Sequence, residues 1–283
     1  MVSKYICERV WCDKVLMIGI ILRVILVEVI AILLSLLANS SAKSIGIDIK
    51  DIKQRTNPKF LLLAVVFNLL FILAVGIILK LLDSKDIGVL NWRINSVGII
   101  FSLLAIFSTF VLAFGFILIL NTKKIISAKY VSMHISNSYE VFIKIFGFSV
   151  LFIAALQEEV MFRGYLNTVL SVYGILCAMI FSSLIFMVWH FMTNRVNLFQ
   201  AVDWFLGGIM LFYVYSVSGS IWVTAAVHFS RNFVNVLVFN ITNDNSLITL
   251  DKPIRPFHKT IYTLILSIVI MLLTYLYYGN ILL

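Results

Sequence analysis

Charged residues are scarce in this sequence. Only 12% of its 283 residues are Asp, Glu, Lys or Arg, whereas 62% are hydrophobic and the mean hydropathy is positive. Soluble domains carry about twice that share of charge, so the composition excludes a soluble globular protein and predicts a polytopic membrane protein. The net charge of +9 comes from Lys and Arg gathered between apolar runs, as at the ends of membrane helices. We therefore expect no nucleic-acid partner.

Cysteine is also rare, and several common signatures are missing. Cys7, Cys12 and Cys177 are odd in number and have no CxxC spacing, which argues against a disulfide framework or a zinc finger. The first apolar run is too long for a signal-peptide core and lacks a convincing cleavage site, so we expect this helix to remain attached. The sequence shows no internal repeat, low-complexity tract or separate soluble domain.

Long apolar runs fill most of the chain. A helix needs about 20 apolar residues to span the hydrocarbon core of a bilayer. By this measure we expect an all-α, polytopic bundle of about eight transmembrane helices, in one integral membrane domain over residues 1–283. The expected spans are 15–37, 60–82, 97–120, 141–170, 173–191, 198–217, 221–239 and 260–278.

Two carboxylates and a guanidinium interrupt the fourth run. Charges inside a spanning helix cost about 2.5 to 3.5 kcal/mol each, so they usually face the protein interior and mark function. Glu159 and Arg163 are four residues apart with the acid first, the favoured order for an ion pair, whereas Glu158 lies about 100° around the helix. We therefore predict that Glu159 and Arg163 support one another and that Glu158 performs chemistry. The alternative is a purely structural buried ion cluster.

Polar residues recur at helical spacing in two later runs. His190 lies four residues after Phe186, and His228 and Asn232 share one helix face. A single histidine in a membrane helix is more often an interhelical hydrogen bonder, but two of them with a double Glu and an Asn favour catalysis. At about 1.5 Å per residue, Glu158 and these three polar residues all fall near the middle of a core about 30 Å thick. We expect them to converge.

Taken in chain order, these charged and polar residues form three motifs that resemble those of the CAAX protease and bacteriocin-processing enzymes, the CPBP or Abi family, over residues 141–239. The resemblance implies an eight-helix intramembrane endopeptidase. Eukaryotic and archaeal members cut after a prenylated cysteine, while many bacterial members are linked to peptide processing or bacteriocin immunity. Nothing in this sequence indicates a prenylated substrate. The motifs are Glu158-Glu159-x-x-x-Arg163, Phe186-x-x-x-His190 and His228-x-x-x-Asn232.

The resemblance also implies roles for single residues. Glu158 corresponds to the general base that activates water, and His190 to the second group that holds this water. His228 and Asn232 correspond to the pair that stabilises the oxyanion. These roles agree with the chemistry, since peptide hydrolysis needs a base within reach of water and donors aimed at the developing negative oxygen.

A metal is the open question in this mechanism. Glu158, His190 and His228 are candidate ligands for a zinc ion with an open fourth position. The HExxH helix is absent, which removes the strongest sequence sign of zinc but does not exclude ligands from separate helices. The family is often labelled metalloprotease, and a metal-free glutamate mechanism has also been argued for it. We expect that no cofactor is required, with zinc as the alternative.

The leading hypothesis is therefore an intramembrane protease in a bacterial cell membrane. Its partners would be the lipid bilayer and a membrane-associated peptide or protein substrate. One alternative is a non-cleaving bacteriocin self-immunity or membrane interaction protein on the same scaffold. Another is a transporter in which Glu, His and Asp203 relay protons, although the inverted repeats and broken helices of transporters are not visible.

Overall fold

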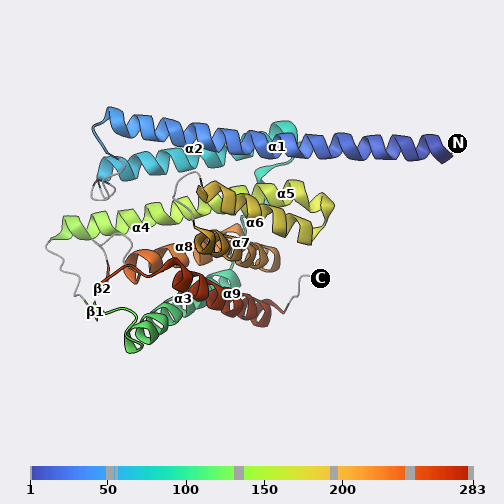
Figure 1. Cartoon of the computed structure of the whole chain (residues 1–283). Helices are drawn as coiled ribbons and strands as arrows, with labels where there is room; N and C mark the ends of the chain where they lie inside the picture. The colour runs from blue at the N-terminus through green and yellow to red at the C-terminus, as the bar shows by residue number, and fades with distance from the viewer. Residues whose placement is uncertain are drawn as a thin grey trace.

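The fold is a bundle of long helices, as the composition predicts (Figure 1). The computed structural model describes residues 2–48, 54, 57–130, 137–191, 197–239 and 246–279, without the side chains of residues 2–16 and 130. The side chains of Cys7 and Cys12 thus lie outside the described part. The described helices are α1 (Val2–Ser44), α2 (Pro58–Leu82), α3 (Ser96–Thr122), α4 (Ser138–Glu159), α5 (Leu166–Leu170), α6 (Ile175–Phe191), α7 (Leu198–Ser218), α8 (Ile221–Leu237) and α9 (Pro256–Tyr278).

Short elements connect these helices. Two 3-10 turns, η2 and η4, precede α3 and α6, and the π-helical segment η3 joins α4 to α5. The strands β1 and β2 form an antiparallel pair in which Lys129 lies opposite Thr249. The bounds are Ile87–Leu90 for η2, Val160–Tyr165 for η3, Ser171–Tyr173 for η4, Ala128–Tyr130 for β1 and Ile248–Leu250 for β2.

Helix starts follow a common local rule. The side-chain oxygens of Asn95, Asn137, Asn197 and Ser220 accept hydrogen bonds from backbone N–H groups in the first turns of α3, α4, α7 and α8. These N–H groups have no partner within their own helix, so the caps satisfy donors that the helix itself leaves unpaired. Gly219 ends α7 in the left-handed conformation, with φ 59°, and makes the tight turn into α8.

The helices pack in a continuous order around the centre of the bundle. α1 lies against α2, α2 against α4 and α4 against α8, while α6 and α9 pack on α7 and α3 packs on α8. Figure 1 shows α1 and α2 on one side and α3 and α9 on the opposite side. Leu62 and Leu103 are exposed on the outside of α2 and α3, which is expected for side chains that face lipid. The central helix α8 thus contacts both halves of the bundle.

Six helical segments are long and apolar enough to cross a membrane, counted over the described residues by length and composition. The sequence predicts eight full spans, and the two exceptions are α6 and α8, each of 17 residues. Seventeen residues cover only about 26 Å at 1.5 Å per residue. Most of α8 is buried against other helices, so its polar residues are shielded from lipid and it needs no apolar outer face.

The boundaries differ from the prediction in two further places. α1 begins at Val2, well before the expected residue 15. The fourth helix runs unbroken past the Glu158 motif, but residues Val160–Tyr165 wind as a π-helix instead of an α-helix. Single π turns inside helices occur frequently at functional sites. Here the π turn contains Arg163 and follows both glutamates.

Candidate active site

The ion pair between Glu159 and Arg163 lies at the junction of α4 and η3. Arg163 Nη1 donates to Glu159 Oε1 at 3.0 Å, and both side chains are fully buried. Arg163 Nη2 donates to the backbone oxygen of Gly208 at 3.1 Å, and its guanidinium lies 4.4 Å from the ring centre of Phe186. A buried pair is tolerated where such extra partners compensate its desolvation. The four-residue spacing correctly predicts this pair.

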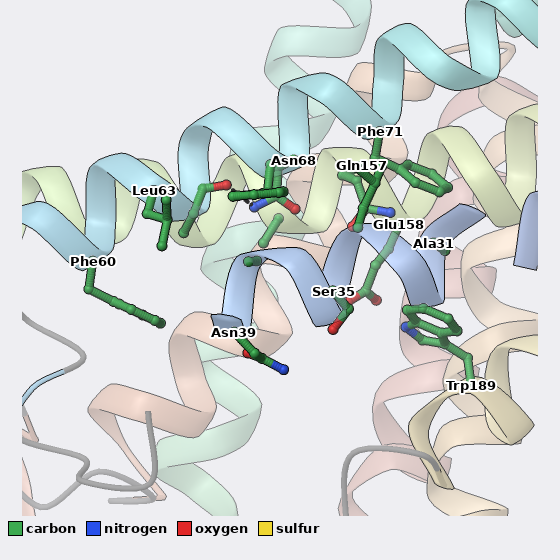
Figure 2. A pocket seen from close by; sticks show the side chains of 15 residues that line it. Ala31, Ser35, Asn39, Phe60, Leu63, Asn68, Phe71, Gln157, Glu158 and Trp189 are labelled. Carbon is green, nitrogen blue, oxygen red and sulfur yellow. Dashed lines mark hydrogen bonds between the residues drawn. The ribbon is translucent and has the colours of Figure 1, made fainter. Parts of the chain in front are cut away.

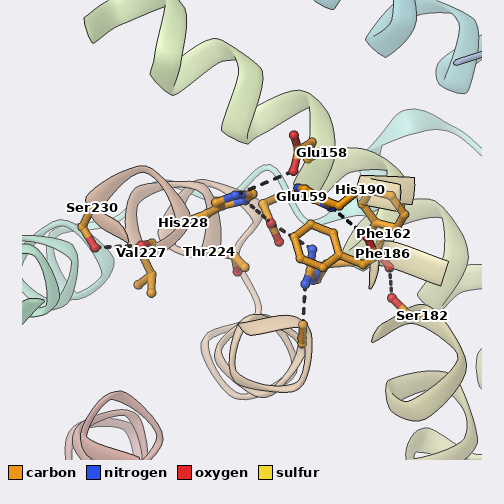
Figure 3. Close-up of polar contacts among 12 residues, drawn as sticks. Glu158, Glu159, Phe162, Ser182, Phe186, His190, Thr224, Val227, His228 and Ser230 are labelled. Atoms are coloured by element: carbon orange, nitrogen blue, oxygen red, sulfur yellow. Dashed lines mark hydrogen bonds and ion pairs between the residues drawn. The ribbon is translucent and has the colours of Figure 1, made fainter. Parts of the chain in front are cut away.

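His228 lies between the two glutamates (Figure 3). Its Nδ1 is 2.7 Å from Glu159 Oε1, the oxygen that also accepts from Arg163, and its Nε2 is 3.7 Å from Glu158 Oε2. A carboxylate held in an ion pair only accepts hydrogen bonds, so Nδ1 carries the hydrogen. The Glu159 carboxylate therefore fixes the orientation of the ring and turns Nε2 toward Glu158. The helical spacing predicts only the contact of Glu159 with Arg163 and not this contact with His228.

Glu158 has a different environment from its neighbour. Its side chain is 21% exposed, whereas that of Glu159 is 0% exposed. Glu158 Oε2 has no hydrogen-bond partner among the described residues. Figure 2 shows the carboxylate pointing between Ser35 and Trp189 into a cavity of about 290 Å³ among α1, α2 and α4, which we call cavity I. The angular separation of the two glutamates along the helix accounts for this difference.

His190 is held by its own helix. Its Nδ1 is 2.8 Å from the backbone oxygen of Phe186, and its ring lies 4.9 Å from that of Trp204 on α7. A backbone oxygen has no hydrogen to give, so Nδ1 donates and the neutral ring keeps a lone pair on Nε2. His190 also lies close enough to Glu158 for the charge of that carboxylate to act on its ring.

The three residues from α6 and α8 share one space. His190, His228 and Asn232 line a cavity of about 360 Å³ between α6, α7, α8 and α9, which we call cavity II. Glu158 lines cavity I instead, and its Oε2 lies 3.7 Å from Nε2 of His228, which lines cavity II. The structure thus brings together the four residues singled out in the sequence, on three helices.

Zinc binding would need three ligands around one point with a fourth position open. In the part of the chain that the structure describes, no three His, Cys, Asp or Glu side chains are grouped closely enough to hold a metal ion. The Nδ1 hydrogen bonds of His190 and His228 would suit zinc ligands, since ligand histidines are usually held in this way. As arranged here, Glu158, His190 and His228 do not fit a zinc site.

The sequence does not predict the roles that several other residues have at the site. Gly208 supplies the backbone oxygen for Arg163, and a Cβ on it would lie 2.9 Å from that of Ser183. Trp204 packs against His190 with the two rings tilted by 32°, and Arg231 pairs with Asp203 in the lining of cavity II. The Gly207 and Gly208 pair inside an apolar helix signals close helix packing, but it does not reveal which side chain uses the space.

One comparison with known proteins identifies this part of the chain. The family described as type II CAAX prenyl endopeptidase Rce1-like matches residues 140–234. Residues 140–234 are thus similar to that family. The Rce1-like segment runs from the first turn of α4 to the last turns of α8, so it includes all four predicted site residues. No curated protein matches the chain significantly.

The Rce1-like match fits the resemblance seen in the sequence. Its bounds agree closely with the range 141–239 over which the three motifs occur. The match supports a CAAX-type intramembrane protease at the level of the family, in a multi-pass membrane protein. α1, α2, α3 and α9 lie outside the matched residues, yet α1 and α2 line cavity I and α9 lines cavity II.

Proposed function

We propose that this chain is an intramembrane endopeptidase that hydrolyses a peptide bond in a membrane-associated peptide or protein. The Rce1-like match supports a peptidase at the family level. The observation that carries the assignment of residues is the position of His228, whose Nδ1 lies 2.7 Å from Glu159 and whose Nε2 lies 3.7 Å from Glu158. One carboxylate is thereby committed to holding the ring, and the other is left to act on water.

Glu158 is the general base in this proposal. A base must lie within about 3 Å of the proton that it removes, and it must not be committed to another cation. Glu159 fails this condition because Arg163 and His228 both donate to its Oε1. Glu158 Oε2 has no such donor among the described residues, and the side chain is partly exposed to cavity I. A water molecule between Glu158 and His190 would donate one hydrogen to the carboxylate and the other to Nε2 of the histidine.

Asn232 and His228 stabilise the tetrahedral intermediate. Asn232 lies one helical turn after His228 on the same face of α8, and both line cavity II. The Asn232 amide donates through its NH₂ group. His228 already donates from Nδ1, so it donates toward the substrate only when Nε2 is also protonated. Donors placed where negative charge develops lower the barrier more than they strengthen substrate binding.

The reaction balances without any other reactant. Water adds its oxygen to the carbonyl carbon while Glu158 takes one proton, and the carbonyl oxygen becomes the oxyanion. The intermediate then collapses, the carbon–nitrogen bond breaks, and Glu158 returns the proton to the leaving nitrogen. The other proton of water stays on the new carboxylic acid and then passes to the amine, so the products are a carboxylate and a protonated amine.

A comparison of cells that produce the wild-type protein and Glu158→Gln tests this function. Mass spectrometry of membrane peptides should find cleavage products that occur only with the wild-type protein, because the amide of Gln cannot accept the proton from water. Both proteins must be present at equal levels in the membrane. Identical peptide sets would contradict the proposal and favour a binding protein that does not cut its partner.

A further inference from the structure

A second charged cluster lies in cavity II, and the mechanism above does not use it. It consists of Arg231 on α8, Asp203 on α7 and Lys259 on α9, all of which line the cavity. Arg231 Nη2 donates to Asp203 Oδ2 and lies 3.5 Å from Thr263 Oγ1. The Arg231 side chain is 8% exposed, so this guanidinium is part of the cavity wall and not a surface charge.

The surrounding backbone is shaped for Arg231. A Cβ on Gly207 would lie 2.8 Å from Arg231 Nη1, so only glycine leaves the guanidinium its place against α7. Thr263 and Asp203 then hold the guanidinium from α9 and α7. Residues on three helices therefore hold this one cation at the wall of the cavity.

The cluster carries an excess of positive charge. Lys259 is half-buried and close enough to interact electrostatically with both Asp203 and Arg231. Two cations thus face a single carboxylate in this cluster. Positive charge in a concave, poorly hydrated space attracts an anion more strongly than the same charge in water.

The cluster lies close to the proposed reaction centre. His228, Arg231, Asn232 and Asn235 follow the spacing i, i+3, i+4 and i+7, and all four line cavity II. Arg231 is about 5 Å from His228 along the helix axis. An extended peptide covers about 3.3 to 3.6 Å per residue, so a group bound by Arg231 would lie within about three residues of the bond that is cut.

We infer that Arg231 and Lys259 bind a carboxylate of the substrate, supplied by its C-terminus or by an Asp or Glu side chain close to the cleaved bond. The planar guanidinium matches a carboxylate in shape and charge, and a second cation strengthens the attraction. That the bound carboxylate belongs to a substrate rests on the proposed function, whereas the existence of the carboxylate site does not. Asp203 holds Arg231 in position when no ligand is present.

Binding to an inactive protein tests this site without any need for turnover. Glu158→Gln protein in lipid nanodiscs would be titrated with fluorescent hexapeptide pools randomised over Ala, Leu, Phe, Ser and Asn. One pool has a free C-terminal acid, a second has a C-terminal amide, and a third has the amide and one Asp at varied positions. Empty nanodiscs correct for partition into lipid. We expect the acid pool, the Asp pool or both to bind about tenfold or more tightly than the neutral amide pool, as for a charge-assisted hydrogen bond.

Variants in the same background assign this preference to the cluster. Arg231→Gln and Lys259→Gln should each remove most of it, whereas Arg93→Gln, which removes an exposed cation outside cavity II, should keep it. Lys259→Gln serves as the test if Arg231→Gln does not fold. Preference for the acid pool assigns the carboxylate to a C-terminus, and preference for the Asp pool assigns it to a side chain.

Two results would overturn the inference. The first is equal affinity for all three pools in the Glu158→Gln protein. The second is a carboxylate preference that survives in Lys259→Gln and in a folded Arg231→Gln. Failure of the proposed function would be seen in a different experiment. A protein that never cleaves a peptide in cells can still show the carboxylate preference in nanodiscs.

Discussion

Nδ1 of His228 lies 2.7 Å from Oε1 of Glu159, although 69 positions separate the two residues in the chain. The same oxygen accepts from Arg163 at 3.0 Å. An ion pair within one helix is thereby extended into a contact between α4–η3 and α8. Glu159 is a positioning residue in this arrangement, because it holds a ring whose other nitrogen faces Glu158.

The two neighbouring glutamates should respond differently to the same change. Glu158→Gln should abolish turnover with little effect on thermal stability, since its carboxylate is partly exposed and has no ion-pair partner as close as Arg163 is to Glu159. Glu159→Gln leaves a fully buried guanidinium without its counter-ion, which should cost about 3 to 5 kcal/mol of stability. Thermal unfolding in detergent and a peptide-cleavage assay measure both effects. Near-normal turnover of Glu158→Gln would show that another residue is the base.

Asn232→Ala should separate binding from catalysis. If the amide donates mainly to the oxyanion, the catalytic rate should fall by about 10²- to 10³-fold while substrate affinity changes little. The structural alternative is that Asn232 only ties α8 to a neighbour, which would cost about 0.6 to 2 kcal/mol of stability. Affinity is measured in the Glu158→Gln background and turnover with Asn232→Ala alone. Normal turnover of Asn232→Ala would rule out the oxyanion role.

Gly208→Ala should weaken the contact between α6 and α7. The added methyl group would lie 2.9 Å from Ser183 Cβ and 3.1 Å from Ser183 Cα, and the backbone cannot yield as a flexible side chain can. Overpacking of this kind costs about 1 to 3 kcal/mol. Gly115→Ala is the matched control, because a Cβ there meets nothing within 4 Å. Equal melting temperatures for both variants would contradict this account of the α6–α7 contact.

Metal analysis of the purified protein decides between a metal-free mechanism and a zinc-dependent one. We expect no stoichiometric zinc and no loss of turnover after treatment with a chelator. A required zinc would instead give about one equivalent per chain and a reversible loss of activity on chelation. Our expectation would be wrong if stoichiometric zinc were found and only added metal restored activity.

Local spacing allowed much of the site to be predicted from the sequence. Glu159 and Arg163 are one helical turn apart, and so are Phe186 and His190, so each pair meets in any helix that contains it. The convergence of Glu158, His190, His228 and Asn232 was also expected from their depth along the helices. However, the depth of a residue along its helix does not determine which atoms of different helices will be in contact.

The amino-acid sequence by itself determined the membrane class of this protein, its helical content and the residues that face inward. These properties depend on composition and on periodicity along one chain segment, because lipid excludes charges and unpaired backbone groups. Only the tertiary structure decided that Glu159 holds His228, that α8 is shielded from lipid, and that Glu158 and His228 line two different cavities. These features depend on how the surfaces of separate helices fit together, and that fit is set by contacts between residues far apart in the chain.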